Sequence, residues 1–171
     1  MDLFNEYMVR RRKSGQDWAL VSAMAVGAMV LTLAVLMLGQ FLGSFTLAVE
    51  AGLLYLLYIG VTSMNVEFEY SVTNGDLDVD KISARRKRTR VVSVHARNFE
   101  YFAPKTAEHM RAFEDASIKA RVDATSNTGG KGVYFAVYYR NDVKTCLAFE
   151  PTQKMLDDFA RHVPRRVFFA E

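Results

Sequence analysis

The longest apolar stretch of the chain covers residues 18–64 and contains one charged side chain, Glu50. A run of about 18 or more apolar residues without charge is long enough to cross a bilayer as a helix. This stretch is too long for one crossing, and its middle, residues 39–44, is rich in glycine and polar side chains that favour a turn. The sequence therefore predicts a transmembrane helical hairpin with spans at 18–38 and 45–64.

Basic residues on both sides of this stretch indicate its orientation. Arg10, Arg11, Arg12 and Lys13 precede it, further basic residues at 85–90 follow it, and the turn at 39–44 has no Lys or Arg. Basic residues are retained on the cytoplasmic side of membrane proteins. We therefore expect a multi-pass protein of the cell membrane, with two spans and both termini in the cytoplasm.

The first 17 residues form a separate segment, amphipathic at its start and basic at its end. Leu3, Phe4, Tyr7 and Met8 follow a helical spacing, and the basic residues 10–13 come next. One interpretation is a helix that lies on the membrane surface, with its basic end against anionic headgroups. The alternative is a tail whose arginines only set the topology.

Two features inside the spans are candidates for function. Small residues recur every four positions, which would let the two helices pack closely, although such residues are also common in spans. They are Ala19, Ala23 and Gly27 in the first span and Ala48 and Gly52 in the second. A charged side chain at mid-bilayer costs about 2.5–3.5 kcal/mol on insertion scales. Glu50 therefore either has a function, such as carrying protons or binding a partner helix, or lies near the outer headgroups.

Residues 65–171 change to the two-residue period of β-strands. Alternation at 66–73 and 76–82 around Asn74-Gly75 predicts a β-hairpin with a type I′ turn. Further strands are expected at 91–99, 116–123, 133–140 and 143–149, with helices between 104 and 115 and at 152–162. The predicted fold class is α+β: the transmembrane hairpin followed by a small antiparallel β-barrel or bent sheet with a C-terminal helix.

Three segments carry a resemblance to a known family. They are EFEYSVTNGDLDVDKI at 67–82, directly after a span, FEPTQKML at 149–156 and HVPR at 162–165. With them the chain resembles an uncharacterised bacterial family of small two-span membrane proteins with a cytoplasmic pleckstrin-homology-like (PH-like) domain. The resemblance covers most of the chain and implies a PH-like domain over 65–171. It implies architecture and not activity, and supplies no catalytic residues.

No cluster of reactive side chains predicts catalysis. The single cysteine, Cys146, is flanked by ordinary strand residues, and the three histidines lack the spacing of metal ligands. The acidic residues at 76, 78 and 80 lack the glycine and glutamate of a calcium loop. The glycine-rich residues 129–132 lack the first glycine of a phosphate loop. We therefore expect a protein that is not an enzyme, with no cofactor, metal, nucleic acid or small-molecule substrate.

The strongest surface feature is the basic cluster that follows the predicted hairpin at 66–82. Its second strand returns towards the membrane, which would bring residues 85–90 near anionic lipid; the alternative is ordinary solvated charge paired with the acidic strand. Candidate lipid-contact residues are Arg10, Arg11, Arg12, Lys13, Arg85, Arg86, Lys87, Arg88 and Arg90. The predicted function is a membrane-anchored binding or scaffold module whose partners are membrane lipids. The alternative is an accessory subunit of a membrane transporter or enzyme complex, with another membrane protein or a second copy as partner.

Overall fold

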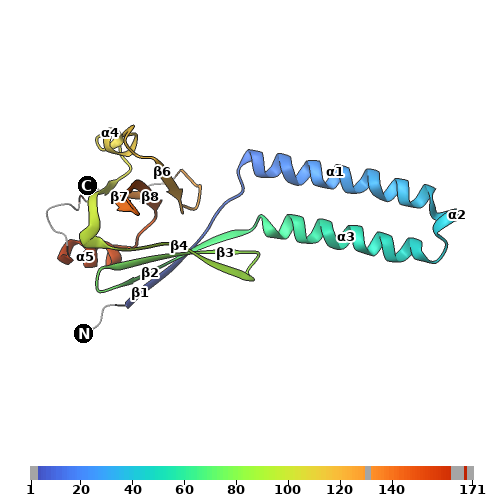
Figure 1. The fold of residues 1–171 in the computed structure, drawn as a ribbon, viewed down its shortest axis with the longest axis horizontal. Helices are drawn as coiled ribbons and strands as arrows, with labels where there is room; N and C mark the ends of the chain where they lie inside the picture. Colours follow the sequence, from blue (N-terminus) through green and yellow to red (C-terminus); the bar gives the residue numbers. More distant parts are fainter. Residues whose placement is uncertain (1–3, 130–131, 163–167, 169–171) are drawn as a thin grey trace. The chain divides into compact units, whose positions relative to one another are not determined.

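The computed structural model describes residues 4–129, 132–162 and 168 (Figure 1). The chain divides into two compact units. Residues 13–66 form the helical unit, and residues 1–12 combine with residues 67–171 in the sheet unit. Residues 1–12, expected to belong to a separate segment, are therefore part of the same unit as the C-terminal two thirds of the chain.

Two long helices and a short one make up the helical unit. Helix α1 spans Gly15–Met37, α2 spans Gly39–Leu42 and α3 spans Phe45–Ser63. The Ser14 hydroxyl accepts a hydrogen bond from the Asp17 amide at 3.2 Å, and the Asp17 carboxylate accepts one from the Ser14 amide at 2.8 Å. This capping box starts α1 about one turn earlier than expected. The two apolar helices confirm the predicted helical hairpin.

The contact between α1 and α3 does not use the small residues that the sequence singled out. In α1, Met24 lies against Gly60 of α3, whose added Cβ would come within 3.3 Å of the Met24 sulfur. Thr32 of α1 donates a hydrogen bond to Glu50 of α3 at 2.6 Å. By contrast, Ala19, Ala23, Gly27, Ala48 and Gly52 are all exposed.

The prediction that these five residues join the two helices is therefore wrong. Ala23 and Met24 are one residue apart, which is about 100° around a helix. Turning the small face towards α3 would thus turn the polar Thr32–Glu50 pair away from it. Polar side chains of membrane helices face protein rather than lipid, so this pair gives a physical reason for the observed rotation.

A strand forms at the N-terminus, where one of the two interpretations of the sequence was a helix. Strand β1 (Phe4–Arg10) pairs antiparallel along its whole length with β2 (Val66–Thr73). Its side chain Val9 is buried, at 6% exposure, whereas Phe4, Tyr7 and Met8 are exposed. An open edge of β2 offers unpaired backbone donors and acceptors, and β1 satisfies them. The interpretation of these residues as a helix on the membrane surface is therefore wrong.

Strands β3 (Asp76–Ser83) and β4 (Lys87–His95) complete the first sheet, in the order β1-β2-β3-β4. Asn74 and Gly75 join β2 to β3 with φ values of 51° and 86°. A type I′ turn needs positive φ at both central residues, so the predicted hairpin is confirmed.

The second sheet has the order β5-β7-β8-β6. Its strands are β5 (Phe99–Pro104), β6 (Ala120–Asp123), β7 (Tyr134–Arg140) and β8 (Val143–Phe149). The expected antiparallel barrel is not closed, because the strands divide into two sheets of four, and β6 pairs with β8 in parallel. A 3-10 turn, η1 (Ala96–Asn98), separates β4 from β5 where the sequence predicted one strand.

The core of the sheet unit gathers around the C-terminal helix α5 (Gln153–His162), as the sequence predicted. Its apolar residue Phe159 is fully buried. The Phe159 ring lies 5.4–6.3 Å, between ring centroids, from those of Phe99, Phe102 and Phe149. Such edge-to-face contacts add to the free energy gained by burying the rings.

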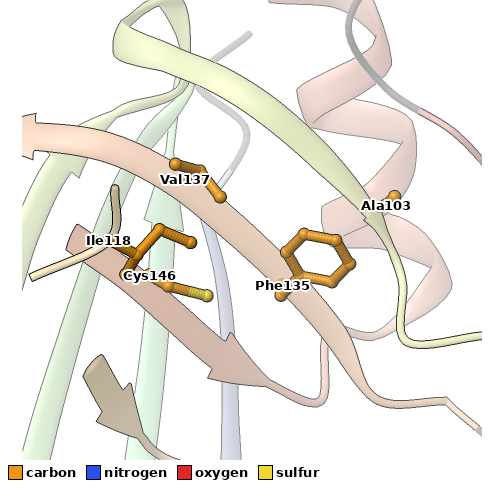
Figure 2. Packing of buried hydrophobic residues seen from close by; sticks show 5 residues of the cluster. All are labelled: Ala103, Ile118, Phe135, Val137 and Cys146. Carbon is orange, nitrogen blue, oxygen red and sulfur yellow. The ribbon is translucent and has the colours of Figure 1, made fainter. Parts of the chain in front are cut away.

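A second apolar cluster lies on the opposite face of the second sheet, because side chains alternate along a strand. It contains Ala103, Ile118, Phe135, Val137 and Cys146, and Figure 2 shows these side chains close together around β7 and β8. The short helix α4 (Met110–Phe113) forms where a helix was expected, and its Ala112 and Phe113 pack against the cluster. The long connection from β5 to β6 therefore covers this face.

Candidate functional site

The outer face of the first sheet carries four carboxylates next to four arginines. The carboxylates are Glu67, Glu69, Asp78 and Asp80, and the arginines are Arg10, Arg85, Arg88 and Arg90. Glu67, Glu69 and Asp80 are each less than 10% exposed although their strand positions point away from the core. We call this group the ion-pair lattice.

Glu67 of the ion-pair lattice lies where three segments of the chain meet. Its Oε1 lies 2.9 Å from Nε of Arg10, at the end of β1, and 3.6 Å from Nε of Arg85, in the turn between β3 and β4. Both arginine side chains are more than half exposed. The start of β2, the end of β1 and the β3–β4 turn therefore lie together at one end of the sheet.

Arg88 and Arg90 of β4 pair with the rest of the lattice. Arg88 contacts Glu69 and lies 3.3 Å from Asp80. Arg90 lies 2.5 Å from Asp80 and 2.7 Å from Asp78, and its hydrogen bond to Asp80 raises the pKa of the guanidinium. Exposed ion pairs contribute only about 0–1 kcal/mol each. These pairs matter more, because the carboxylates are buried beneath the arginine side chains.

Four of the nine candidate lipid-contact residues, Arg10, Arg85, Arg88 and Arg90, are thus engaged by carboxylates. This is the arrangement that the alternative interpretation of the basic cluster described. The Lys13 ammonium lies 5.4 Å from the centre of the Trp18 ring. Within the described residues, Arg11, Arg12, Arg86 and Lys87 have no carboxylate in ion-pair distance, and all four are exposed. We call these four residues the free basic rim.

The free basic rim belongs to the end of the sheet that contains Glu67. Arg86 ends the β3–β4 turn, in which Ala84 and Arg85 have φ values of 53° and 57°, and Lys87 is the first residue of β4. Arg11 and Arg12 directly follow β1. The chain continues from Arg12 to Gly15, the first residue of α1, and returns from Ser63, the last residue of α3, to β2.

Helices α1 and α3 are long and apolar enough to cross a membrane. They have 23 and 19 residues. The most apolar 18-residue stretch of each has a mean hydropathy of 2.4 and 1.7, respectively, and no residue of either stretch is buried. A contiguous exposed apolar surface of this kind is typical of a membrane or protein contact. Glu50, the predicted intramembrane polar residue, is half-buried. Its Oε1 accepts a hydrogen bond from Thr32, and its Oε2 has no hydrogen-bond partner among the residues that the structure describes. Thr32 is not among the residues predicted from the sequence, because its pairing with Glu50 depends on how α1 and α3 face each other.

The loop after β6 fixes the backbone of Arg12. The Arg12 amide donates a hydrogen bond to the carbonyl of Ser126 at 2.8 Å, and the Asn127 side chain donates one to the Arg12 carbonyl at 3.4 Å. Ser126 is itself held by Glu150, whose carboxylate accepts from its amide at 3.0 Å and from its hydroxyl at 2.7 Å. The segment that leads to α1 is therefore anchored to both sheets.

A cavity of about 470 Å³ opens beside this loop, against the outer face of the second sheet. Its walls include Lys105, Phe113, Arg121 and Cys146. Cys146 is 2% exposed, and burial raises the pKa of its thiol to about 11. Gly129, from the glycine-rich segment at 129–132, also lines the cavity, whereas residues 130 and 131 lie outside the described residues.

A second cavity, also about 470 Å³, has a group of ion-paired side chains in its wall. Lys144 lies 3.1 Å from Asp115 and 3.4 Å from Glu100, all three on the cavity wall. Hydrogen bonds from Ser117, with a further one from Lys144, lower the pKa of Asp115 to about 2. The one cation of this group, Lys144, is already shared between the two carboxylates.

The contacts of the histidines are with residues other than Cys146 in the described part of the chain. His95 packs against His162 with ring centroids 5.9 Å apart, and His109 shares a hydrogen bond of 2.7 Å with the Tyr101 hydroxyl. Among the described residues, no three His, Cys, Asp or Glu side chains are placed to hold a metal ion.

Two sheets, a packed C-terminal helix and an apolar helical hairpin define the class: a PH-like domain with two helices that could span a membrane. The sequence matches the family described as bacterial PH-like domain (DUF6106) over residues 1–169, and the chain belongs to this family. The resemblance inferred from the sequence is thereby confirmed. No curated protein and no solved structure matches the chain.

Proposed function

We propose that this chain is a non-enzymatic binding module, anchored in the cell membrane by α1 and α3, whose PH-like domain contacts anionic lipid on the cytoplasmic face. The observation that carries the proposal is the free basic rim: Arg11, Arg12, Arg86 and Lys87 lack carboxylate partners among the described residues, at the end of the sheet where the chain leaves for α1. The five other candidate residues contribute less, since four are neutralised in the ion-pair lattice.

Chain length supports contact between this rim and the headgroups. Arg12 and Gly15 are three residue-to-residue steps apart along the chain, at most about 3.6 Å each. Arg12 therefore lies within about 11 Å of the start of α1, close to the Debye length of about 8 Å at physiological ionic strength. Near an anionic leaflet each basic residue contributes about 1 kcal/mol to membrane attraction.

The pairing of β1 with β2 supports the proposal that both ends of the helical unit lie on the same side of the membrane. β1 precedes the helices, β2 follows them, and the two strands are paired. A chain that crosses the membrane between paired strands must return to the side it left. The excess of basic residues at this side favours the cytoplasm.

The test uses the full-length protein reconstituted in bilayers with equal amounts of phosphatidylcholine and phosphatidylglycerol. Native mass spectrometry after release into neutral detergent counts the lipids that remain bound. We expect phosphatidylglycerol to be retained over phosphatidylcholine. Replacing Arg11, Arg12, Arg86 and Lys87 with Gln should abolish this preference.

A matched control variant removes four basic residues elsewhere: Arg97, Arg111, Lys119 and Lys154, all exposed. It should keep the preference for phosphatidylglycerol. Equal retention of the two lipids by the wild type, or equal loss in both variants, would contradict the proposal.

A second candidate, an accessory subunit of a larger membrane complex, is favoured by one observation. The stripe of Ala19, Ala23 and Gly27 is exposed, and a Cβ at Gly27 would meet nothing within 4 Å. Small residues of this kind let a further helix approach closely. Native mass spectra of the protein extracted directly from cell membranes in mild detergent would show such a subunit, or a second copy, as an added mass.

A further inference from the structure

The cavity beside the loop after β6 combines an apolar floor with a basic edge. Met110, Phe113, Val122, Val133 and Ala148 provide apolar walls. Lys105 and Arg121 are the basic residues of its lining, and both are exposed. A volume of about 470 Å³ is within the range of small-molecule sites, which are mostly apolar with a few polar groups that fix orientation.

The two basic side chains share one aromatic ring. The Lys105 ammonium lies 4.3 Å from the centre of the Phe113 ring, and the Arg121 guanidinium carbon lies 5.2 Å from it. Arg121 also donates a hydrogen bond of 2.6 Å to the Phe113 carbonyl, which fixes the guanidinium at the cavity. Cation–π contacts hold the charges in place without neutralising them.

No carboxylate neutralises this pair in the part of the chain that the structure describes. The acidic residue of the lining, Asp123, accepts hydrogen bonds from the Thr125 amide at 3.0 Å and hydroxyl at 2.7 Å. The two positive charges also act on the Cys146 thiol in the cavity wall. Burial raises the pKa of Cys146, and the charges of Arg121 and Lys105 oppose that rise. The cavity therefore presents two positive charges that repel each other. An anion bound between them would offset this repulsion.

We propose that this cavity binds an anionic amphiphile, with its acidic headgroup at Lys105 and Arg121 and its apolar portion on Phe113, Met110 and Val133. A phosphate or carboxylate headgroup suits the two cations, because charge-assisted hydrogen bonds to such groups are the strongest that side chains make. The apolar walls require a ligand that also carries a hydrocarbon or ring portion.

The position of the cavity in the chain favours a membrane source for this ligand. Thr125 and Asn127 line the cavity, and Ser126 between them holds the Arg12 backbone, three residues before α1. The membrane source rests on the proposed function, whereas binding of the amphiphile itself does not.

Cys146 provides a readout, since it is the single cysteine of the chain and lines the cavity. Its thiol is buried, so alkylation requires the cavity wall to open, and a ligand bound in the cavity would oppose that opening. Full-length protein in neutral phosphatidylcholine nanodiscs is alkylated with iodoacetamide under mildly alkaline conditions and followed by intact mass. Octyl phosphate is titrated in one arm and octanol in another, and a third arm replaces part of the bilayer lipid with phosphatidic acid. We expect octyl phosphate to slow alkylation saturably and octanol to have little effect.

Replacing Lys105 and Arg121 with Gln should raise the half-protecting concentration of octyl phosphate at least about tenfold, because two charge-assisted contacts are lost. The control variant, with Arg111 and Lys119 replaced by Gln, has the same charge change outside the cavity lining and should behave as the wild type. Thermal unfolding verifies that each variant is folded. Protection by phosphatidic acid as well would identify the bilayer as the source, and protection by octyl phosphate alone would identify a soluble amphiphile.

The absence of saturable protection, equal protection by octanol, or an unchanged titration in the Lys105/Arg121 variant would overturn the proposal. A failure of the proposed function is separate, because it is measured as lost phosphatidylglycerol preference. Replacing the free basic rim should remove that preference and leave the protection of Cys146 by octyl phosphate intact.

Discussion

At the scale of single residues, Arg88 supports a buried carboxylate. Its guanidinium pairs with Glu69, whose side chain is 7% exposed, and it also lies 3.3 Å from Asp80. Replacing Arg88 with Met leaves Glu69 without its ion-pair partner, and an unpaired buried charged group costs about 1–3 kcal/mol or more. We expect Arg88→Met to lower the free energy of unfolding of the sheet unit by about this amount, measured by denaturant unfolding in neutral detergent.

The neighbouring substitution Arg86→Met is the control, because Arg86 is exposed and lies in the free basic rim. Surface substitutions of this kind stay within about 0.5 kcal/mol of the wild type. Equal destabilisation by the two substitutions would contradict a structural role for the Arg88 pairs.

Sequence reasoning identified the charges of the ion-pair lattice but not their partners. Alternation along β3 predicts that Asp78 and Asp80 share the outer face, and the basic cluster follows soon after. A register shift between Val79 and Asp80 then places Asp80 opposite Arg90. Such bulges have no reliable sequence signal, so the individual pairs could not be predicted.

At the scale of elements, Gly75 joins the β2–β3 hairpin to α5. Its amide donates a hydrogen bond of 2.9 Å to the carboxylate of Asp158, which is 1% exposed. A Cβ on Gly75 would lie 2.9 Å from Cγ of His162, and its φ of 86° disfavours any other residue. We expect Gly75→Ala to destabilise the sheet unit by about 1–3 kcal/mol through strain and overlap, measured as a lower melting temperature.

Gly129→Ala separates the two causes. Gly129 also has positive φ, at 62°, but a Cβ there would meet nothing within 4 Å. It should therefore show the smaller loss, from backbone strain alone. Adding His162→Ala to Gly75→Ala should restore part of the stability, and no recovery would argue against the overlap.

Elements with local signals were predictable, and elements made by distant pairing were not. The turn at Asn74-Gly75 and the apolar face of α5, with Met155, Leu156 and Phe159, are short-range patterns, and both are confirmed. The apolar residues of β1 have the spacing of a helix, which is one of the two interpretations of this segment. Its strand conformation depends on β2, more than fifty residues later. The cavity was missed for the same reason: Lys105 and Arg121 meet at Phe113 only in the folded chain.

At the scale of the whole molecule, the apolar hairpin is an insertion between two paired strands. β1 ends at Arg10, opposite Glu67 of β2, so the two strands pair although the helical unit, residues 13–66, lies between them in the chain. A domain built from residues 65–171 alone, as the sequence suggested, would lack its edge strand. Two crossings are also the smallest number that can return the chain to its own sheet.

This topology predicts that the PH-like domain folds without the hairpin, provided that β1 is kept. Residues 1–12 joined by a short Gly/Ser linker to residues 67–171 should give a soluble monomer, measured by size-exclusion chromatography and circular dichroism. Residues 67–171 alone should be less stable, by at least about 1.5–3 kcal/mol for the lost burial of Val9. The bare edge of β2 should also make this fragment prone to aggregation. Equal stability of the two proteins would mean that β1 is not an integral strand of the sheet, and the insertion topology would be wrong.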